Sequence, residues 1–475
     1  MAKKFYITTT LPYVNADPHI GFAMEIIRAD TVARYHRLLG EEVIFNTGTD
    51  EHGLKVFRKA AQEKKSPQEY CDKHVTKYQG LKNLLNLSVT HFTRTTDQFH
   101  IEAAQEFWRR CQKNGDIYKA KYQIKYCVGC ELEKTESELA NGRCPIHPDK
   151  TIEIIDEENY FFRFSKYQKQ LLALYEERPD FVIPKFRLGE IKKFIQAGPK
   201  DFSISRLKSK MPWGVPVPDD PEQVMYVWFD ALINYISALG WPKDLDNFKG
   251  FWPGVQIAGK DNLRQQSAMW QAMLISAGLP TSKQIYIEGF INTGGQKMSK
   301  SLGNVIDPFE LVEKYGTDAV RYYLLREIPA YDDGDFSIQR FEELYNADLA
   351  NGLGNTVSRV AKLVENSGLE FNGTRLPKKV LRNAQKNALA DFRFDLILNN
   401  IWVTDLHPIE IHVDQHQPWL IKDKDKLLLV LQEEVDSLRE VALKISPFLP
   451  ETAEKIRKQF AGPKIKSEKP LFPRV

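Results

Sequence analysis

Short apolar runs alternate with longer segments of helical periodicity over the first quarter of the chain. Residues 4–10 and 41–46 are apolar runs of strand length, and residues 18–39 between them have the pattern of a helix. Pro18 suits the first turn of that helix, where a missing backbone N–H costs little. Further helical patterns reach to about Asn114. Strands that alternate with helices in this way predict an α/β fold with a parallel sheet.

The alternation is interrupted by residues 115–225, which contain clustered cysteines, a mixed-charge run and a proline-rich end. It resumes with the apolar run Val255–Gly259. Beyond about residue 335 the pattern is helical almost throughout, and Lys424–Ser446 has the pattern of a long amphipathic helix. The sequence therefore predicts a parallel-sheet domain that is split by an insertion and followed by an α-helical bundle.

Composition narrows the class of protein. The chain has 475 residues, too many for one ordinary core, and its 42% hydrophobic and 27% charged residues are typical of globular proteins. It has no apolar run of the roughly 18 residues that a membrane helix needs, and its start does not resemble a secretion signal, so we expect a cytoplasmic protein without a membrane partner. A net charge of only +3 means that local patches would have to meet a polyanion; Lys185–Lys193 and Arg206–Lys210 are the candidates.

Two motifs together predict a site for a triphosphate. Pro18-His19-Ile20-Gly21 opens a helix directly after a strand, where free backbone N–H groups and the helix dipole favour an anion. His19 adds a donor, and Gly21 leaves room for a flat base. Lys297-Met298-Ser299-Lys300-Ser301 follows a Gly-Gly turn, and its two lysines could close over a leaving pyrophosphate. Either motif alone is more often an ordinary helix start or a solvated loop.

Asp50 marks the carboxyl end of the second predicted strand, within Thr49-Asp50-Glu51-His52-Gly53. Ligands of open parallel sheets bind just beyond such ends, so Asp50 could pair with a substrate ammonium group. Thr and Asp are also good helix caps, and that alternative is compatible with binding.

The clustered cysteines have the spacing of a metal knuckle. Cys127-x-x-Cys130 and Cys144-x-x-His147 can place three thiolates and one imidazole around a tetrahedral Zn²⁺. The protein would fill all four positions, so the site would be structural. A reduced thiol cluster is the alternative. An odd total of five cysteines also argues against a disulfide framework, and we expect Cys71 and Cys111 to be core residues.

Asn355 and Arg359 lie four residues apart and would share one face of a helix. Together with the Trp419 indole they could read and stack an unpaired base. The local alternative is a surface arginine and a tryptophan in the core of the bundle.

These motifs, with Thr10–Asn15, Tyr226–Ala231, Gly259–Asp261 and Leu302–Pro308, resemble the methionyl-tRNA synthetases, a family of class I aminoacyl-tRNA synthetases. The zinc pattern is similar to that of the single-knuckle bacterial form. The resemblance implies a Rossmann-like catalytic domain and a two-step reaction. The carboxylate of methionine attacks the α-phosphate of ATP, accompanied by Mg²⁺, to give methionyl-adenylate and pyrophosphate. The terminal ribose of the tRNA then takes the aminoacyl group.

The resemblance also assigns residues. His19, Gly21, Lys260, Asp261, Lys297 and Lys300 would handle ATP, with His19, Lys297 and Lys300 as catalytic groups. The methionine pocket would consist of Leu11, Tyr13, Asp50, Trp228, Ala231, Tyr235, Gln266 and Trp270. Asn355, Arg359 and Trp419 would read the CAU anticodon. Three positions depart from the family pattern: Phe22 replaces a common histidine, Asn262 a common aliphatic residue, and Gln266 another histidine. We expect Gln266 to hold the Tyr13 hydroxyl and to help set selectivity for methionine.

The sequence pattern and the resemblance together predict five segments and an assembly state. The expected segments are 1–114 and 226–290 for the catalytic domain, 115–225 for the zinc-bearing insertion, 291–348 for the connector with the Lys297 loop, and 349–475 for the anticodon-binding bundle. A monomer is expected. The alternatives are a non-catalytic zinc-knuckle RNA-binding protein and a related ligase for cysteine or a branched aliphatic amino acid, although residues 115–225 leave no room for the long editing insertion of the aliphatic enzymes.

Overall fold

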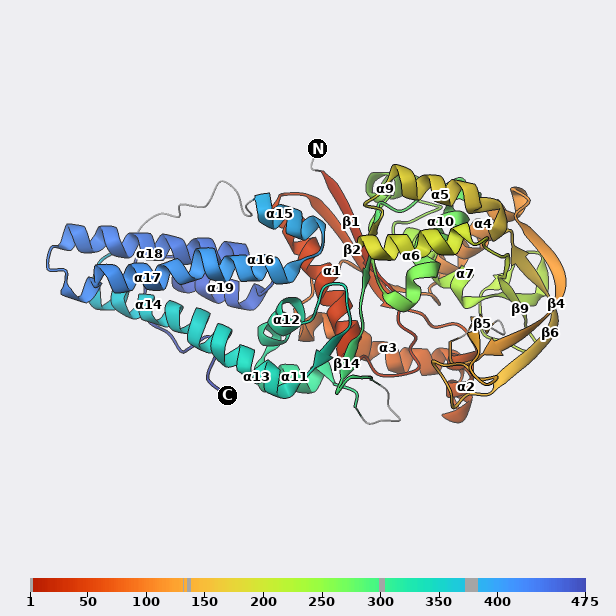
Figure 1. The fold of residues 1–475 in the computed structure, drawn as a ribbon, viewed down its shortest axis with the longest axis horizontal. Coiled ribbons are helices and arrows are strands. Elements are labelled where there is room, and N and C mark those ends of the chain that lie inside the picture. The colour runs from red at the N-terminus through yellow and green to blue at the C-terminus, as the bar shows by residue number, and fades with distance from the viewer. Residues whose placement is uncertain (1–2, 131, 135–137, 299–303, 372–382) are drawn as a thin grey trace.

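The computed structural model describes residues 3–130, 132–134, 138–298, 304–371 and 383–475. An α/β body lies at one end of an elongated molecule and a bundle of long helices at the other, with α1 and α12 between them (Figure 1). This arrangement confirms the predicted fold class.

A parallel sheet forms the centre of the α/β body. Its strand order is β3-β2-β1-β12-β13-β7. The strands are β1 (Lys4–Thr9), β2 (Glu42–Thr49), β3 (His91–Arg94), β7 (Val182–Ile183), β12 (Val255–Gly259) and β13 (Gln284–Glu288). From β1 the chain continues to β2 on one side of the β1–β12 pair, and from β12 it continues to β13 on the other side. Open parallel sheets bind ligands at such a point, beyond the carboxyl ends of the strands.

Alternate residues of each central strand enter different cores, which is why these strands are apolar on both faces. Phe5 and Ile7 of β1 lie in one buried cluster with α1, whereas Tyr6 lies in the other with Trp108 and Trp270. The helices of this body are α1 (Ile20–Leu38), α2 (Leu54–Gln62), α3 (Pro67–Leu84), α4 (Gln98–Lys113), α7 (Val227–Ala231), α8 (Asn234–Ser237), α9 (Leu245–Phe251) and α10 (Trp270–Ser276).

The segment 115–225 contains two small antiparallel sheets. One has the order β5-β4-β6-β8 and the other β10-β11-β9. Their strands are β4 (Ile117–Cys127), β5 (Leu132–Lys134), β6 (Ile152–Phe162), β8 (Phe202–Ser203), β9 (Ser205–Leu207), β10 (Pro216–Val217) and β11 (Asp220–Met225). Helices α5 (Gln168–Glu177) and α6 (Lys185–Gln196) flank β7, which returns to the six-stranded sheet and pairs with β13. The expected contiguous insertion therefore contributes one edge strand to the main sheet.

The last third of the described chain is helical apart from the small sheet β15-β14-β16. Its elements are β14 (Ile291–Thr293), β15 (Gln296–Lys297), β16 (Gly334–Phe336), α11 (Pro308–Tyr315), α12 (Thr317–Arg326), α13 (Ile338–Leu344), α14 (Asn355–Ser367), α15 (Asn383–Ala390), α16 (Phe394–Ile401), α17 (His407–His416), α18 (Lys424–Ile445) and α19 (Pro450–Gln459). Within the part of the chain that the structure describes, no helix combines the length and apolar character needed to cross a bilayer.

Candidate active site and metal centre

The start of α1 differs from the open anion site that the sequence predicts. The Ile20 amide donates to the Ile306 carbonyl at 3.1 Å, and the Gly21 amide donates to His19 Nδ1 at 3.1 Å. His19 is therefore the helix cap as well as an exposed side chain at the sheet edge. Because these first amides already have acceptors, a phosphate here would depend on side-chain cations more than on the helix terminus.

The two predicted ATP motifs lie together. Gly294 and Gly295 form the β14–β15 turn with φ values of 61° and 72°, a conformation that glycine adopts without strain. Met298 then reaches α1: its Cε lies 3.9 Å from the position that a Cβ of Gly21 would occupy. Ser299, Lys300 and Ser301 lie outside the described residues. Because Ile306 also bonds α1, both flanks of this loop meet the start of the helix.

Gly259 ends β12, and Lys260 and Asp261 follow it directly at the same sheet edge. Lys260 Nζ pairs with Asp333 Oδ2 at 2.7 Å and lies 4.6 Å from the centre of the Phe290 ring. The ammonium group is thus held toward the connector that carries the Lys297 hairpin.

The expected methionine residues come together from distant parts of the chain. Asp50 is 4% exposed, and its amide donates to the Pro12 carbonyl at 2.9 Å, which pairs the segment of Leu11 and Tyr13 with the end of β2. Tyr13 and Trp228 pack on one aromatic cluster with Tyr126 and Tyr226. Tyr235 and Trp270 are buried in a separate cluster with ring centroids 5.9 Å apart, and Ala231 ends α7 at a point of the chain between Trp228 and Tyr235.

A buried carboxylate that the sequence analysis did not single out joins the two halves of this site. Asp230 Oδ2 accepts from His52 Nδ1 at 2.6 Å, and Oδ1 accepts from His100 Nε2 at 2.8 Å. The two imidazoles hold the pKa of Asp230 at about 2, although burial alone would raise it. Since His52 lies two residues after Asp50, and Asp230 two residues after Trp228, this bridge fixes the segments of Asp50 and Trp228 relative to each other.

Replacing Asp230 with asparagine is expected to lower stability, because the amide can accept only one of the two N–H bonds. The pKa of Asp230 is lower in the folded chain than in the unfolded chain, so its ionised carboxylate stabilises the fold by about 2 kcal/mol above pH 3.8. That stabilisation is lost as the pH falls toward 2. We expect Asp230→Asn to lower the apparent Tm at pH 7 by roughly 5–10 °C and to raise the KM for methionine. Exposed Asp246→Asn is the matched control. A melting curve that coincides with that of the control would contradict the prediction.

Gln266 contacts a different tyrosine from the one we expected. Its Nε2 donates to the Tyr235 hydroxyl at 2.5 Å, and its Oε1 accepts from Gln256 Nε2 at 3.0 Å. Tyr13 lies instead on the aromatic cluster of Tyr226. The amide of Gln271 donates to the Gln266 carbonyl at 2.8 Å, so the residue is fixed from both sides in a buried amide network.

The network predicts an effect on selectivity. Gln266→Met keeps the length of the side chain but leaves the Tyr235 hydroxyl and the Gln256 amide without this partner, at a cost of about 1–3 kcal/mol. We expect the ratio of methionine to norleucine activation to fall, measured as kcat/KM in pyrophosphate exchange. Tyr235→Phe should reproduce the effect, and the double variant should add little to it. An unchanged ratio in Gln266→Met would show that the amide only fills space.

The cysteine cluster has the geometry of a metal centre. The ligand atoms of Cys127, Cys130, Cys144 and His147 all lie within 4.8 Å of one another. Cys130 Sγ is 3.4 Å from Cys144 Sγ and 3.2 Å from His147 Nδ1. Gly129 is required there, because a Cβ would come within 2.4 Å of the His147 ring. Three sulfurs and one ring nitrogen suit a tetrahedral metal ion.

The residues expected to read an anticodon gather at one face of the bundle. Trp419 is 54% exposed, which excludes the alternative of a core tryptophan. The Arg359 guanidinium lies 5.8 Å from its ring centre and pairs with Asp414 at 2.5 Å. Asn355 is exposed at the start of the same helix, α14.

The prediction of a basic surface patch at Arg206–Lys210 is wrong for Arg206. Arg206 is 4% exposed, stacks 4.3 Å from the Tyr226 ring centre and donates to Ser203 Oγ at 2.7 Å. It supports the aromatic cluster from behind and does not offer a surface charge.

Phe22 has a structural role at the position where a histidine is common. Its ring meets Tyr78 edge-on at 5.8 Å, and the Tyr78 hydroxyl donates to the carbonyls of Tyr13 and Ala16.

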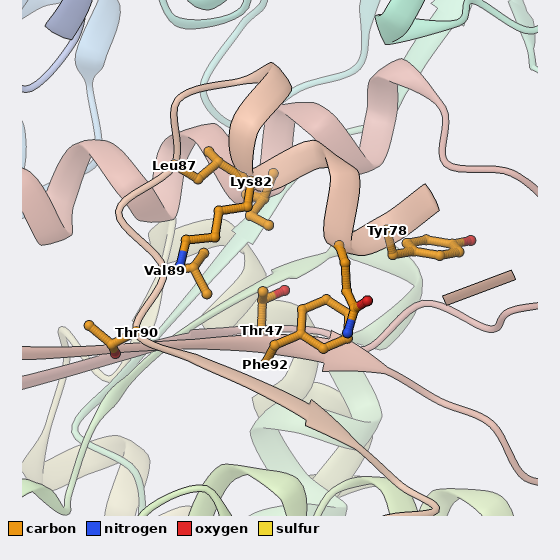
Figure 2. A pocket seen from close by; sticks show the side chains of 9 residues that line it. Thr47, Tyr78, Lys82, Leu87, Val89, Thr90 and Phe92 are labelled. Atoms are coloured by element: carbon orange, nitrogen blue, oxygen red, sulfur yellow. The ribbon is translucent and has the colours of Figure 1, made fainter. Parts of the chain in front are cut away.

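A surface pocket of about 230 Å³ lies beside α1, between α3 and β2–β3, with Leu87, Val89 and Phe92 on its walls (Figure 2). None of the residues that line this pocket is among the candidate site residues.

Comparison with known proteins decides the family. The model of "tRNA synthetases class I (M)" matches residues 5–151 and 130–361. The methionine–tRNA ligase of Thermotoga maritima is 42% identical over 95% of this chain and 74% of its own length. The enzyme of Thermosynechococcus vestitus is 52% identical over 76% of this chain and 69% of its own. The chain belongs to the methionyl-tRNA synthetase family.

Solved structures of the family superpose on the whole chain. Mycobacterium tuberculosis methionyl-tRNA synthetase in complex with methionyl-adenylate is 36% identical, covers 99% of this chain and 100% of its own, and has a TM-score of 0.91. The free form of that enzyme has a TM-score of 0.85 at 32% identity over 100% of this chain and 99% of its own. The methionyl-tRNA synthetase fold thus includes both the α/β body and the helical bundle.

Proposed function

We propose that this chain attaches methionine to its cognate tRNA through a methionyl-adenylate, using ATP. The proposal is carried by two sets of contacts. Both flanks of the Lys297 loop contact the start of α1, and the segments of Asp50 and Trp228 are joined through the His52–Asp230 bridge and the cluster that holds Tyr13 and Trp228. In the proposed reaction a nucleotide binds at the first set of contacts and an amino acid at the second.

The side chains suit this reaction without a protein nucleophile. Asp50 is the group to hold the amino group of methionine, and Tyr13, Trp228, Tyr235 and Trp270 surround the thioether, which interacts well with aromatic rings. His19, Lys297 and Lys300 would stabilise charge that develops on the phosphates, with Gly21, Lys260 and Asp261 around the nucleoside. Positioning and electrostatics supply most of the rate in such transfers.

The cofactors follow from donor chemistry. We propose Zn²⁺ as the ion of Cys127, Cys130, Cys144 and His147, where it would hold the knuckle together. Mg²⁺ would accompany ATP as its counterion. We propose that Asn355, Arg359 and Trp419 read the anticodon, and we retain the five segments predicted from the sequence as its domains. We expect a cytoplasmic monomer.

Amino-acid-dependent exchange of pyrophosphate into ATP, measured with each of the twenty amino acids in turn, tests the proposal. We expect exchange with methionine far above the other nineteen, and aminoacylation of a methionine-accepting tRNA by the same preparation. Exchange that depends on cysteine or a branched aliphatic amino acid would replace the substrate. Binding of tRNA without any exchange would indicate the non-catalytic alternative.

A further inference from the structure

Arg28 lies buried where α1 passes between the catalytic sheet and the connector. Its Nη1 donates to Glu288 Oε2, at the end of β13, at 3.0 Å. Its Nη2 donates to the carbonyls of Ile328 and Pro329 at 3.1 and 2.9 Å. The guanidinium therefore fastens the beginning of the segment 328–335, which follows α12 and includes the first two residues of β16, to the sheet.

The other end of the segment 328–335 reaches the proposed ATP residues. Asp333 Oδ2 pairs with Lys260 Nζ at 2.7 Å. Asp335 Oδ1 accepts from the Gly295 amide at 3.0 Å, in the turn that precedes Lys297. Since β16 also pairs with β14, a shift of this segment would move Lys260 and the hairpin together.

The helical bundle touches the same segment through the turn between α15 and α16. The Phe392 ring, 3% exposed, stacks on the Tyr286 ring of β13 with centroids 4.3 Å apart and planes at 5°. The Tyr331 hydroxyl donates to the Asp391 carbonyl at 2.5 Å. The Tyr286 hydroxyl in turn donates to the Ala330 carbonyl. One turn of the bundle thus contacts both the sheet and the segment 328–335.

We infer that the turn Asp391–Arg393 is a positioning element, in which Phe392 and Tyr331 tie the placement of the bundle to Lys260 and the Lys297 hairpin. The inference rests on the function proposed above. Trp419 lies in the α17–α18 connection, at the far end of the bundle from this turn (Figure 1). A tRNA held at that end is aligned with the active site only if the contact at the near end is rigid.

Phe392→Leu tests the inference by separating the two reaction steps. Pyrophosphate exchange needs no tRNA, and Arg28 still holds the segment in this variant, so we expect exchange to stay within about twofold of the parent. Transfer of methionine from the enzyme-bound adenylate to tRNA, measured in a single turnover, should slow by roughly threefold to thirtyfold. Equal losses in both steps, or no loss in transfer, would overturn the inference.

Three further variants keep the test specific. Phe472→Leu removes another buried aromatic ring of the bundle, one that contacts Tyr345 and not the segment, and should leave both rates unchanged. Phe392→Tyr keeps the stack and should retain fast transfer. Tyr331→Phe removes one hydroxyl and should slow transfer alone, even if Phe392→Leu fails to fold.

A double-mutant cycle with Trp419→Ala asks whether the turn acts on tRNA engagement. If it does, Phe392→Leu should reduce kcat/KM for tRNA less in the Trp419→Ala background than in the parent. Effects that multiply would mean that the two sites act independently and would overturn the inference. A parent chain without methionine-dependent exchange would refute the proposed function instead.

Discussion

Replacing Lys297 with methionine is expected to lower the kcat of methionine-dependent pyrophosphate exchange by about 10²–10³-fold. Methionine keeps most of the length of the side chain and removes only the charge. The start of α1 cannot compensate, because the amides of Ile20 and Gly21 already donate to Ile306 and His19. We therefore expect Lys297 to be a main source of positive charge for the leaving pyrophosphate.

The kinetic pattern identifies the role. A contact that forms mainly in the transition state affects kcat more than the KM for ATP. Lys297→Arg retains the charge and should keep more activity than Lys297→Met. Lys300→Met, in the part of the loop outside the described residues, should lower kcat in the same way. Lys314→Ala, which removes an exposed lysine on α11, is the matched control. A kcat within about threefold of the parent in both Lys297→Met and Lys300→Met would refute the assignment.

The sequence predicted those parts of the fold that have a strong local signal. The strands β1, β2 and β12 are buried on both faces, and each contains an apolar stretch, at Phe5–Ile7, Val43–Phe45 and Ile257–Ala258. Strand β7 is a two-residue edge strand, too short for any periodicity to reveal. Helix α1 was found by its length and boundaries, yet Glu25, Arg28 and Asp30 are buried in it, where a polar residue would be expected on the surface. Arg28 pairs with Glu288 and Asp30 pairs with Arg321, both far away in the chain.

In the candidate site, too, the sequence predicted what depends on local spacing and missed what depends on long-range contacts. Metal-ligand spacing is local, so the sequence could place Cys127, Cys130, Cys144 and His147 together. The Asp230 bridge joins residues 178 positions apart in the chain, and only folding brings them together. A signal was present, since Asp230 and His52 each lie inside a motif that carries pocket residues. Spacing could not show which residues pair, and for the same reason Gln266 was assigned to the wrong tyrosine.

Replacing Cys144 with serine is expected to abolish metal binding and to weaken methionine activation. Serine does not provide the thiolate that a tetrahedral S₃N site needs, and a structural metal contributes directly to folding of its domain. Elemental analysis of the purified chain should fall from about one equivalent of zinc to near none. Cys111→Ala removes another fully buried cysteine, outside the cluster, and should retain the metal.

The effect on activity follows from packing at the knuckle. Val128, between two of the ligands, packs against the buried cluster of Tyr126 and Tyr226, and Tyr13 and Trp228 pack against the same cluster. A knuckle without metal would therefore release one wall of the methionine pocket while leaving the ATP residues in place. We expect the KM for methionine to rise by tenfold or more, equivalent to about 1.4 kcal/mol of binding, with a smaller change in the KM for ATP. Loss of zinc with unchanged methionine kinetics would show that the pocket holds its shape without the knuckle, and equal increases in both KM values would indicate general unfolding of the catalytic domain.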